Sequence, residues 1–256
     1  MFEGKELVGG VNIIKYKNFL TEDECQKLID FYNSRYDRWN QICFYNSYGM
    51  GVTEPLNLDG GKQPLLDDVY IENLKKKMEE YCSDASGRPM KVNSMHAQKW
   101  EVGAYASDHS DNSDLEGNPS GWSDNKYFSG VYLNEDYEGG ILGFRDHGIN
   151  LKLNTGDFLT FPGGVENIHS VSEITAGTRY TLIVFWDYAD SEYSQEEIER
   201  RQADIARERI YQYKLKQEWK KGIGHPVIED PYAPIDNVEF DEKGNIVVKD
   251  EDNLSL

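Results

Sequence analysis

A histidine and an aspartate separated by one residue are the first candidates for chemistry, in the motif His109-Ser110-Asp111. Side chains at this spacing project to the same side of an extended chain, so an imidazole and a carboxylate can reach one cation together. His169, which follows the turn Pro162-Gly163-Gly164 and opens an apolar run, is placed to supply a third ligand. Two histidines and one carboxylate leave three positions open on an octahedral metal, as in non-haem Fe(II) oxygenases. We therefore expect His109, Asp111 and His169 to form a metal site.

Arg179 is the candidate anchor for a co-substrate of such an oxygenase. It lies ten residues beyond His169, at the start of the apolar run 179–186. A buried guanidinium is tolerable when a carboxylate meets it, and 2-oxoglutarate would present one. The alternative is an arginine at a strand end whose charged head reaches solvent.

Other candidates have simpler explanations. Residues 108–117 are rich in Asp and Asn, but they lack the glycine and the terminal glutamate of an EF-hand calcium loop. Three histidines have no ligand at useful spacing and are expected to be exposed or locally hydrogen-bonded: His96, His147 and His225. Three cysteines lack metal-type spacing and are expected to be reduced thiols: Cys25, Cys43 and Cys82.

The composition limits the classes of partner. The 256 residues include 46 acidic and 27 basic side chains, which gives a formal charge of -19. Such a charge disfavours nucleic acid, because every phosphate contact would oppose the field of the whole surface. The chain has no apolar run long enough to span a membrane, and its start lacks the pattern of a signal peptide. We expect a soluble, cytoplasmic protein without a membrane partner.

Helices are predicted on both sides of a central β-rich region. Thr21-Glu22-Asp23-Glu24 is a capping box, and apolar residues at helical spacing follow it. A second helix is predicted over 65–81, and a third, after the capping box Ser194-Gln195-Glu196-Glu197, as far as Lys221. Between the first two, the glycine-rich stretch 45–61 is predicted to be a loop, either a lid over a substrate or a flexible connection.

The region 91–188 has short β-type runs separated by Gly, Asn, Asp and Pro, which is typical of a sandwich or barrel. The run at Arg179 is the clearest, because both of its alternating faces are apolar after the first residue. The predicted strands are 91–100, 128–133, 141–144, 150–153, 157–161, 168–171 and 179–186.

The stretch Trp100 to Trp186 resembles the catalytic core of the prolyl 4-hydroxylase branch of the Fe(II)/2-oxoglutarate dioxygenases. The resemblance covers roughly 90 of the 256 residues and rests on five landmarks in order. These are Trp100-x-x-Gly103, His109-x-Asp111, Tyr132-Leu133-Asn134 with Gly139-Gly140 and Phe144, the strand Gly156 to Phe161, and His169-Ser170-Val171 with Arg179.

The resemblance implies an α+β, mainly β fold: a double-stranded β-helix, or jelly-roll barrel, with supporting N-terminal helices and a C-terminal helix. The expected boundaries are a dioxygenase domain at 1–189, with helical support to 90 and the barrel core from 91, then a helix at 190–221 and an acidic tail at 222–256. It also implies that iron is held by the two histidines and Asp111. Arg179 would hold 2-oxoglutarate, with Tyr132 donating its hydroxyl to the same carboxylate.

The implied reaction is hydroxylation of a prolyl residue in a peptide or protein, with release of succinate and CO2 and with ascorbate as the reductant that restores Fe(II). Two alternatives remain open: the same chemistry on another amino-acid side chain or a small metabolite, or a non-catalytic, cupin-like metal-binding barrel. The sequence departs from the family at Trp100, where tyrosine is usual, and at Tyr105, which lies one residue further from His109 than expected. Arg179 replaces the lysine of the collagen-type enzymes.

Overall fold

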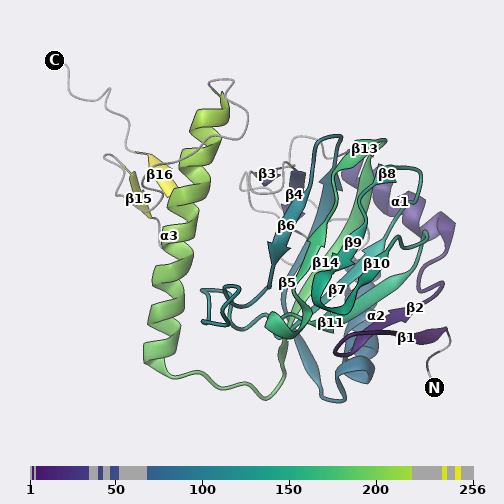
Figure 1. Cartoon of the computed structure of the whole chain (residues 1–256), viewed down its shortest axis with the longest axis horizontal. Coiled ribbons are helices and arrows are strands. Elements are labelled where there is room, and N and C mark those ends of the chain that lie inside the picture. The colour runs from purple at the N-terminus through teal and green to yellow at the C-terminus, as the bar shows by residue number, and fades with distance from the viewer. Residues whose placement is uncertain are drawn as a thin grey trace. The chain divides into compact units, whose positions relative to one another are not determined.

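A computed structural model describes residues 2, 4–34, 40–42, 47–51, 68–220, 238–240 and 246–248. The chain divides into two compact units, Met1–Glu192 and Tyr193–Leu256. The first unit contains the β-rich region and two helices, and the second contains a long helix and a short hairpin (Figure 1). All the candidate site residues lie in the first unit.

Two antiparallel sheets form the body of the first unit. The large sheet has eight strands in the order β1 (Lys5–Gly9), β2 (Ile13–Tyr16), β11 (Phe158–Pro162), β7 (Tyr127–Tyr132), β14 (Arg179–Tyr188), β5 (Met90–Trp100), β4 (Ser47–Gly51) and β3 (Asn40–Ile42). The small sheet has the order β10 (Ile149–Leu151), β9 (Leu142–Phe144), β12 (His169–Val171) and β6 (Ala106–His109). A further pair joins β8 (Glu138–Gly139) to β13 (Ile174–Ala176). This is the predicted jelly-roll architecture, and the predicted fold class is confirmed.

Strand β14 lies between β7 and β5 in the large sheet, and it explains how the two faces of that sheet are built. Leu182, Val184 and Trp186 belong to the apolar core on one face. Arg179, Ile183 and Phe185 alternate with them and line a cavity on the other face. A strand that is buried on both faces requires a cover on each side.

Helices α1 (Glu22–Asn33) and α2 (Asp68–Ser86) provide one of these covers. The predicted capping box begins α1: the Glu24 N–H donates to the Thr21 hydroxyl at 3.2 Å, and the Thr21 N–H donates to the Glu24 carboxylate at 2.8 Å. The buried faces of the two helices join the large sheet in one core, with Leu28 and Ile29 from α1 and Leu74 and Met78 from α2. Full burial of such a side chain stabilises the fold by about 1.5–3 kcal/mol.

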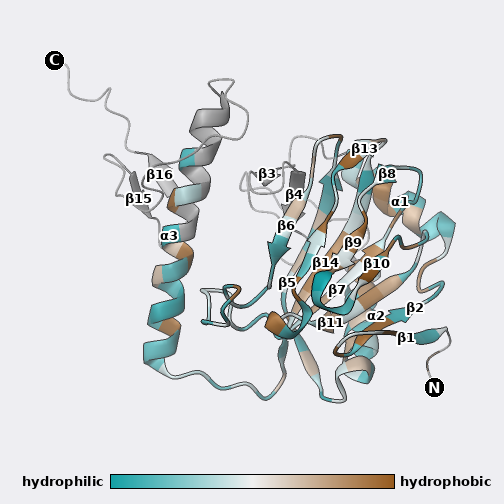
Figure 2. Ribbon diagram, viewed as in Figure 1, coloured by the Kyte–Doolittle hydropathy of each residue, from teal (hydrophilic) through white to brown (hydrophobic). Residues whose placement is uncertain are grey.

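The small sheet covers the opposite face of the large sheet. A second apolar core lies there, and its members include Trp100, Tyr132, Phe144, Phe161 and Val171. Figure 2 shows hydrophobic colour on the central strands of both sheets, whereas the outer strand β1 is more hydrophilic. The functional candidates lie at this second core.

The seven predicted strands are all present, with ends shifted by up to two residues. The structure adds the N-terminal hairpin β1–β2 and the short strand β6, which were not predicted. It also corrects the prediction of a loop over 45–61, because residues 47–51 form β4, which pairs with β5. The other residues of that stretch, and with them the lid interpretation, lie outside the described residues.

The second unit contains α3 (Gln195–Lys220) and the hairpin of β15 (Val238–Phe240) and β16 (Ile246–Val248). The Glu197 N–H donates to the Ser194 hydroxyl at 3.2 Å, which is one of the two bonds of the predicted capping box. Ion pairs join Asp204 to Arg200 and Arg207 along the mostly hydrophilic surface of α3 (Figure 2). None of the helices described is long and apolar enough to cross a membrane. The rest of the predicted acidic tail lies outside the described residues.

Candidate metal and co-substrate site

The histidines of the predicted metal site lie on neighbouring strands of the small sheet. His109 ends β6 and His169 begins β12, and the antiparallel register places the two directly opposite each other. Asp111 follows His109 by two residues, and its backbone N–H donates to the Gly163 carbonyl at 2.8 Å. Strand pairing therefore brings together residues that are sixty positions apart in sequence.

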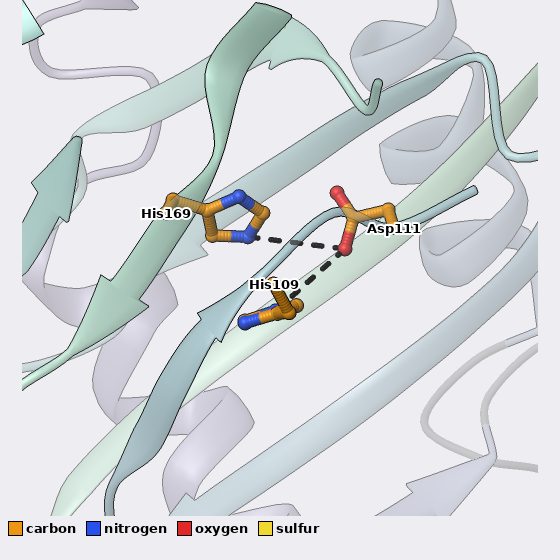
Figure 3. Close-up of side chains that lie close together, drawn as sticks. All are labelled: His109, Asp111 and His169. Carbon is orange, nitrogen blue, oxygen red and sulfur yellow. Dashed lines mark ion pairs between the residues drawn. The ribbon is translucent and has the colours of Figure 1, made fainter. Parts of the chain in front are cut away.

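The three side chains converge (Figure 3). The Asp111 Oδ1 atom lies 3.8 Å from His169 Nε2 and 4.0 Å from His109 Nε2. The imidazole rings are 4.3 Å apart between centroids, and one ligand atom from each residue lies within 4.8 Å of the others. Atoms at these separations can ligate a single cation.

Backbone carbonyls set the tautomer of both histidines. His109 Nδ1 lies 2.7 Å from the carbonyl oxygen of Ser107, and His169 Nδ1 lies 3.0 Å from that of Asn167. A carbonyl only accepts hydrogen bonds, so in a neutral ring Nδ1 carries the proton and Nε2 keeps its lone pair. Both Nε2 atoms face Asp111, so each histidine presents the ligand form of its ring to the carboxylate.

The electrostatics of the triad favour a bound cation. Burial raises the pKa of Asp111 to about 6, although His109 acts in the opposite direction. Burial also lowers the pKa of His169 to about 4 and that of His109 below its usual value. The Asp111 Oδ2 atom is buried without a hydrogen-bond partner. Neutral imidazoles beside an unpaired buried carboxylate are a donor set that suits a divalent metal, so these residues fit Fe(II).

Gly163 makes room for the aspartate. A Cβ atom at this position would lie 2.9 Å from the carbonyl oxygen of Asn125 and 3.1 Å from the Asp111 Cβ. Any larger residue at position 163 would therefore clash with Asp111 and with the Asn125 carbonyl. The turn Pro162-Gly163-Gly164 does more than reverse the chain, because it accommodates one of the three candidate ligands.

Arg179 is buried, with 4% of its surface exposed, so the alternative of a side chain that reaches solvent is wrong. Its Nη2 group donates to the Tyr132 hydroxyl at 3.1 Å, and its guanidinium lies 4.9 Å from the ring centroids of both Trp100 and Tyr132. The Nε and Nη1 groups are buried without a hydrogen bond of good geometry. Burial raises the pKa of the nearby Tyr137 hydroxyl to about 12, and the Arg179 charge acts in the opposite direction. The described part of the chain offers this cation no carboxylate, so an anionic ligand would meet an unsatisfied, prearranged guanidinium.

One cavity connects the triad with Arg179. Its polar lining consists of the three triad side chains, Gln98, Tyr132 and Arg179. Its apolar lining is made by Trp100, Ala106, Phe128, Leu142, Phe161, Val171, Ile183 and Phe185. The candidate metal ligands and the candidate anchor therefore share a largely apolar chamber, in which charged contacts are screened weakly.

Comparison with solved structures identifies the architecture. The viral collagen prolyl hydroxylase of Paramecium bursaria Chlorella virus-1, in complex with 2OG, has a TM-score of 0.51 at 17% identity over 72% of this chain and 100% of that chain. AviO1 of Streptomyces viridochromogenes Tue57 has 0.52 at 11%, over 72% and 93%. A 2OG-Fe(II) oxygenase family protein of Burkholderia pseudomallei has 0.51 at 13%, over 69% and 84%.

This chain has the fold of the 2-oxoglutarate-dependent oxygenases. The resemblance inferred from the five sequence landmarks therefore extends to the arrangement of the sheets. Comparison with models of protein families and with curated proteins finds no match. At these identities the likeness shows the fold.

The structure brings together every residue predicted for the site, and it adds lining residues that were not predicted. Gln98, Phe128 and Phe185 line the cavity. The alternation of β5, β7 and β14 was the only signal for them, and it does not say which face holds the metal. Tyr105, 37% exposed, is not among the lining residues, whereas Trp100 is.

The structure also accounts for two of the weaker candidates. His147 Nε2 lies 2.8 Å from the Glu166 carbonyl oxygen, so this histidine is locally hydrogen-bonded, as expected. In the calcium-like stretch, the Asp114 carboxylate accepts hydrogen bonds from the backbone of Glu116 and from the backbone and side chain of Asn118. These bonds explain the aspartate as part of a turn.

Proposed function

We propose that this protein is an Fe(II)- and 2-oxoglutarate-dependent dioxygenase that hydroxylates prolyl residues in a peptide or protein. One observation carries the proposal: a single cavity holds a buried carboxylate oxygen of Asp111 and two buried N–H groups of Arg179, all without partners. Unpaired buried charges are costly, so their retention in one chamber indicates two ligands of opposite charge. A divalent metal and a dicarboxylate satisfy both.

The proposal assigns a role to each residue. His109, Asp111 and His169 would hold Fe(II), and Arg179 with the Tyr132 hydroxyl would hold the carboxylate of 2-oxoglutarate that is remote from the metal. When bound, iron and 2-oxoglutarate activate dioxygen, yielding succinate, CO2 and a hydroxylated substrate. The protein positions the reactants and excludes water, and ascorbate would keep the iron reduced.

The charge of the cavity favours proline over the alternative substrates. Among the described lining residues, the ionisable groups besides Tyr132 are the triad and Arg179, and the proposed ligands engage both. A lysyl ammonium or a free amino acid would enter without a counter-charge, which is unfavourable in an apolar chamber. A prolyl side chain is uncharged and suits walls such as Phe128, Ile183 and Phe185. One of the structural neighbours is a collagen prolyl hydroxylase.

Turnover with defined peptides tests the proposal. The protein would be incubated with Fe(II), 2-oxoglutarate, ascorbate and either a proline-containing peptide or a matched peptide in which lysine replaces proline. We expect succinate formation and the mass of one added oxygen atom on the proline peptide alone. The variant His169→Ala is the control for adventitious iron. Oxygen added to the lysine peptide would change the substrate class, and iron binding without any succinate would identify a non-catalytic metal-binding barrel.

A further inference from the structure

The cavity side of the large sheet carries a strip of polar side chains on β5 that the proposed reaction does not use. Register places Gln98 opposite Thr181 of β14 and Gly49 of β4, and His96 opposite Ile183 and Gly51. Directly paired residues of antiparallel strands share a face, so Gln98 and His96 point to the same side as the cavity-lining Ile183. The β4 residues that pair with Gln98 and His96 are both glycines.

The orientation of the Gln98 amide is fixed by its neighbour. The indole N–H of Trp100 donates to Gln98 Oε1 at 3.1 Å. An indole nitrogen is only a donor, so the amide oxygen has to face it and the NH2 group points away. Among the described residues this NH2 group has no acceptor, and the side chain lines the cavity. Trp100 also packs against the Arg179 guanidinium, which holds the indole in place.

His96 provides the second polar group of the strip. Its ring is half-buried, and it forms no hydrogen bond with the described residues. Either neutral tautomer retains one N–H donor. Gln98 and His96 therefore present donors two residues apart on one face of one strand, which is about 7 Å at the rise of a β-strand.

We propose that Gln98 and His96 of β5, beside Gly49 and Gly51 of β4, bind the main chain of the substrate peptide by donating to its carbonyl oxygens. This proposal rests on the proposed function, since it names the surface that would lead a prolyl residue to the metal. A proline-rich chain keeps its carbonyl acceptors but lacks N–H donors, so a complementary surface has to supply donors.

The exposure of Gln98 separates this role from binding of the co-substrate. Arg179 and Tyr132 are almost fully buried, with 4% and 2% of their surface exposed, whereas Gln98 is half-buried. The amide therefore lies towards the open side of the cavity, where a peptide would arrive. An uncharged amide donor also suits an uncharged carbonyl acceptor better than it suits a dicarboxylate, for which Arg179 is already present.

Peptide binding to three variants tests the strip. The probe is a fluorescein-labelled proline decapeptide, followed by anisotropy in the presence of Mn(II) and 2-oxoglutarate so that no turnover occurs. Gln98→Met keeps the length of the side chain and removes its N–H groups together with the oxygen that accepts from the Trp100 indole, and we expect the peptide Kd to rise about fivefold. His96→Phe should raise it by about threefold, and Gly51→Val, which adds a branched side chain to the strand position paired with His96, by at least about fivefold.

Two controls separate binding from general damage. Gln26→Met makes the same chemical change on the exposed surface of α1, where the amide bonds only to Asp30, and it should leave the Kd unchanged. Uncoupled turnover without peptide should show the same 2-oxoglutarate requirement in Gln26→Met as in the original protein. A raised 2-oxoglutarate requirement with an unchanged peptide Kd in Gln98→Met would overturn the proposal and assign Gln98 to the co-substrate.

The outcomes also separate this inference from the proposed function. If the protein forms no succinate but binds the decapeptide, and the three variants weaken that binding, the strip is a peptide-binding surface and the assignment of the reaction is wrong. If the original protein does not bind the decapeptide at all while still forming succinate, the strip proposal is wrong and the dioxygenase assignment stands.

Discussion

The two faces of the large sheet differ in how their buried polar groups are arranged. On the face covered by α1 and α2, the Trp186 indole donates to the Ser129 hydroxyl at 2.8 Å, and Ser129 donates to Thr160 at 2.9 Å. Thr160 in turn donates to the Phe128 carbonyl at 2.8 Å, and the Cys82 thiol lies 3.5 Å from its hydroxyl. Each group in this series of hydrogen bonds has a partner within the protein, and on this side the Tyr70 hydroxyl is a buried group without a hydrogen bond.

The cavity face keeps buried polar atoms without partners. They include Asp111 Oδ2, the Nε and Nη1 groups of Arg179, and the hydroxyl of Thr181. Both faces belong to the same sheet, so the difference does not follow from overall polarity. It teaches that buried polar groups satisfied within the chain stabilise the fold, whereas those left unsatisfied together in one cavity indicate where ligands bind.

The largest expected effect is on the metal triad. Replacing any one of His109, Asp111 or His169 with alanine should abolish turnover, because two remaining ligands hold Fe(II) too weakly and in the wrong geometry. Succinate formation measures the loss, and the melting temperature of each variant checks that it folds. If Asp111→Ala retained more than a tenth or so of the activity, the cavity face would not contain the metal site proposed.

The next largest effect concerns the anchor. Arg179→Ala should raise the 2-oxoglutarate requirement by at least ~10²-fold, consistent with about 3 kcal/mol for loss of a desolvated charge pair. Tyr132→Phe should raise it less, because it removes one neutral donor. Titration with Mn(II) should show that Arg179→Ala binds metal as tightly as the original protein does. If Arg179→Ala kept the normal 2-oxoglutarate requirement, the co-substrate would bind elsewhere in the protein.

The unpaired Asp111 carboxylate should also make the metal-free protein less stable than a variant that lacks this charge. The folded pKa of Asp111, about 6, is above its ordinary value of 3.8, so at pH 7.5 the buried charge opposes folding. That cost disappears as pH falls through this window. Asp111→Asn should therefore stabilise the metal-free protein at pH 7.5 by about 1–3 kcal/mol.

Denaturant unfolding with a chelator present measures this effect. The comparison belongs at pH 7.5 because the lowered pKa of His169, about 4, works in the other direction: the folded state resists protonation, so stability is lost as pH falls below about 6.5. Bound metal should reverse the order, stabilising the original protein and not the variant. A less stable metal-free Asp111→Asn variant would show that the carboxylate has a structural role.

A substitution on the helix-covered face should lower the stability of the protein and leave its 2-oxoglutarate requirement unchanged. Ser129→Ala removes the acceptor of the Trp186 indole, and we expect a loss of about 1–3 kcal/mol in the free energy of unfolding. The 2-oxoglutarate requirement should not change, since Ser129 faces away from the cavity. Chemical denaturation and uncoupled turnover measure the two quantities. A changed co-substrate requirement with normal stability would contradict the division between the faces.

The smallest effect is expected from the second unit. Removing residues 236–256 deletes the hairpin β15–β16, and an isolated two-stranded hairpin is marginally stable in water. The melting temperature and uncoupled turnover should stay nearly unchanged. A marked loss of either would mean that Val238, Phe240, Ile246 and Val247 pack on the body or on a second subunit.

Local patterns predicted much of the fold. The capping box at Thr21 and the alternation of β14 each express a local rule of the chain. Strand β6 was missed because its residues, Ala106 to His109, have no apolar alternation. It is a strand because it pairs with β12. The hairpin β1–β2 was missed for a similar reason, since β1 is largely exposed and charged.

The site residues were predictable where the chemistry requires one particular kind of side chain. Imidazole, carboxylate and guanidinium at fixed spacings indicated His109, Asp111, His169 and Arg179, although spacing alone did not show that they share one cavity. The contribution of Gln98 was not predictable, because its orientation comes from a hydrogen bond to Trp100 within the folded strand. Register, which places β4 glycines beside β5, is a long-range property that no short window of sequence contains.

The carbonyl groups that orient the two histidines give this centre a particular mutational robustness. Ser107 and Asn167 supply main-chain oxygens to His109 and His169, and every amino acid carries the same oxygen. The buried Asn167 side chain also bonds to the main chain of Val11 and Pro162, so this freedom belongs to position 107. Substitutions at position 107 should therefore leave the orientation of the His109 imidazole unchanged. The vulnerability moves to the course of the polypeptide itself: an inserted residue between 107 and 109 would separate the ring from the oxygen that orients it. Insertions and deletions are thus expected to be less tolerated here than changes of side chain.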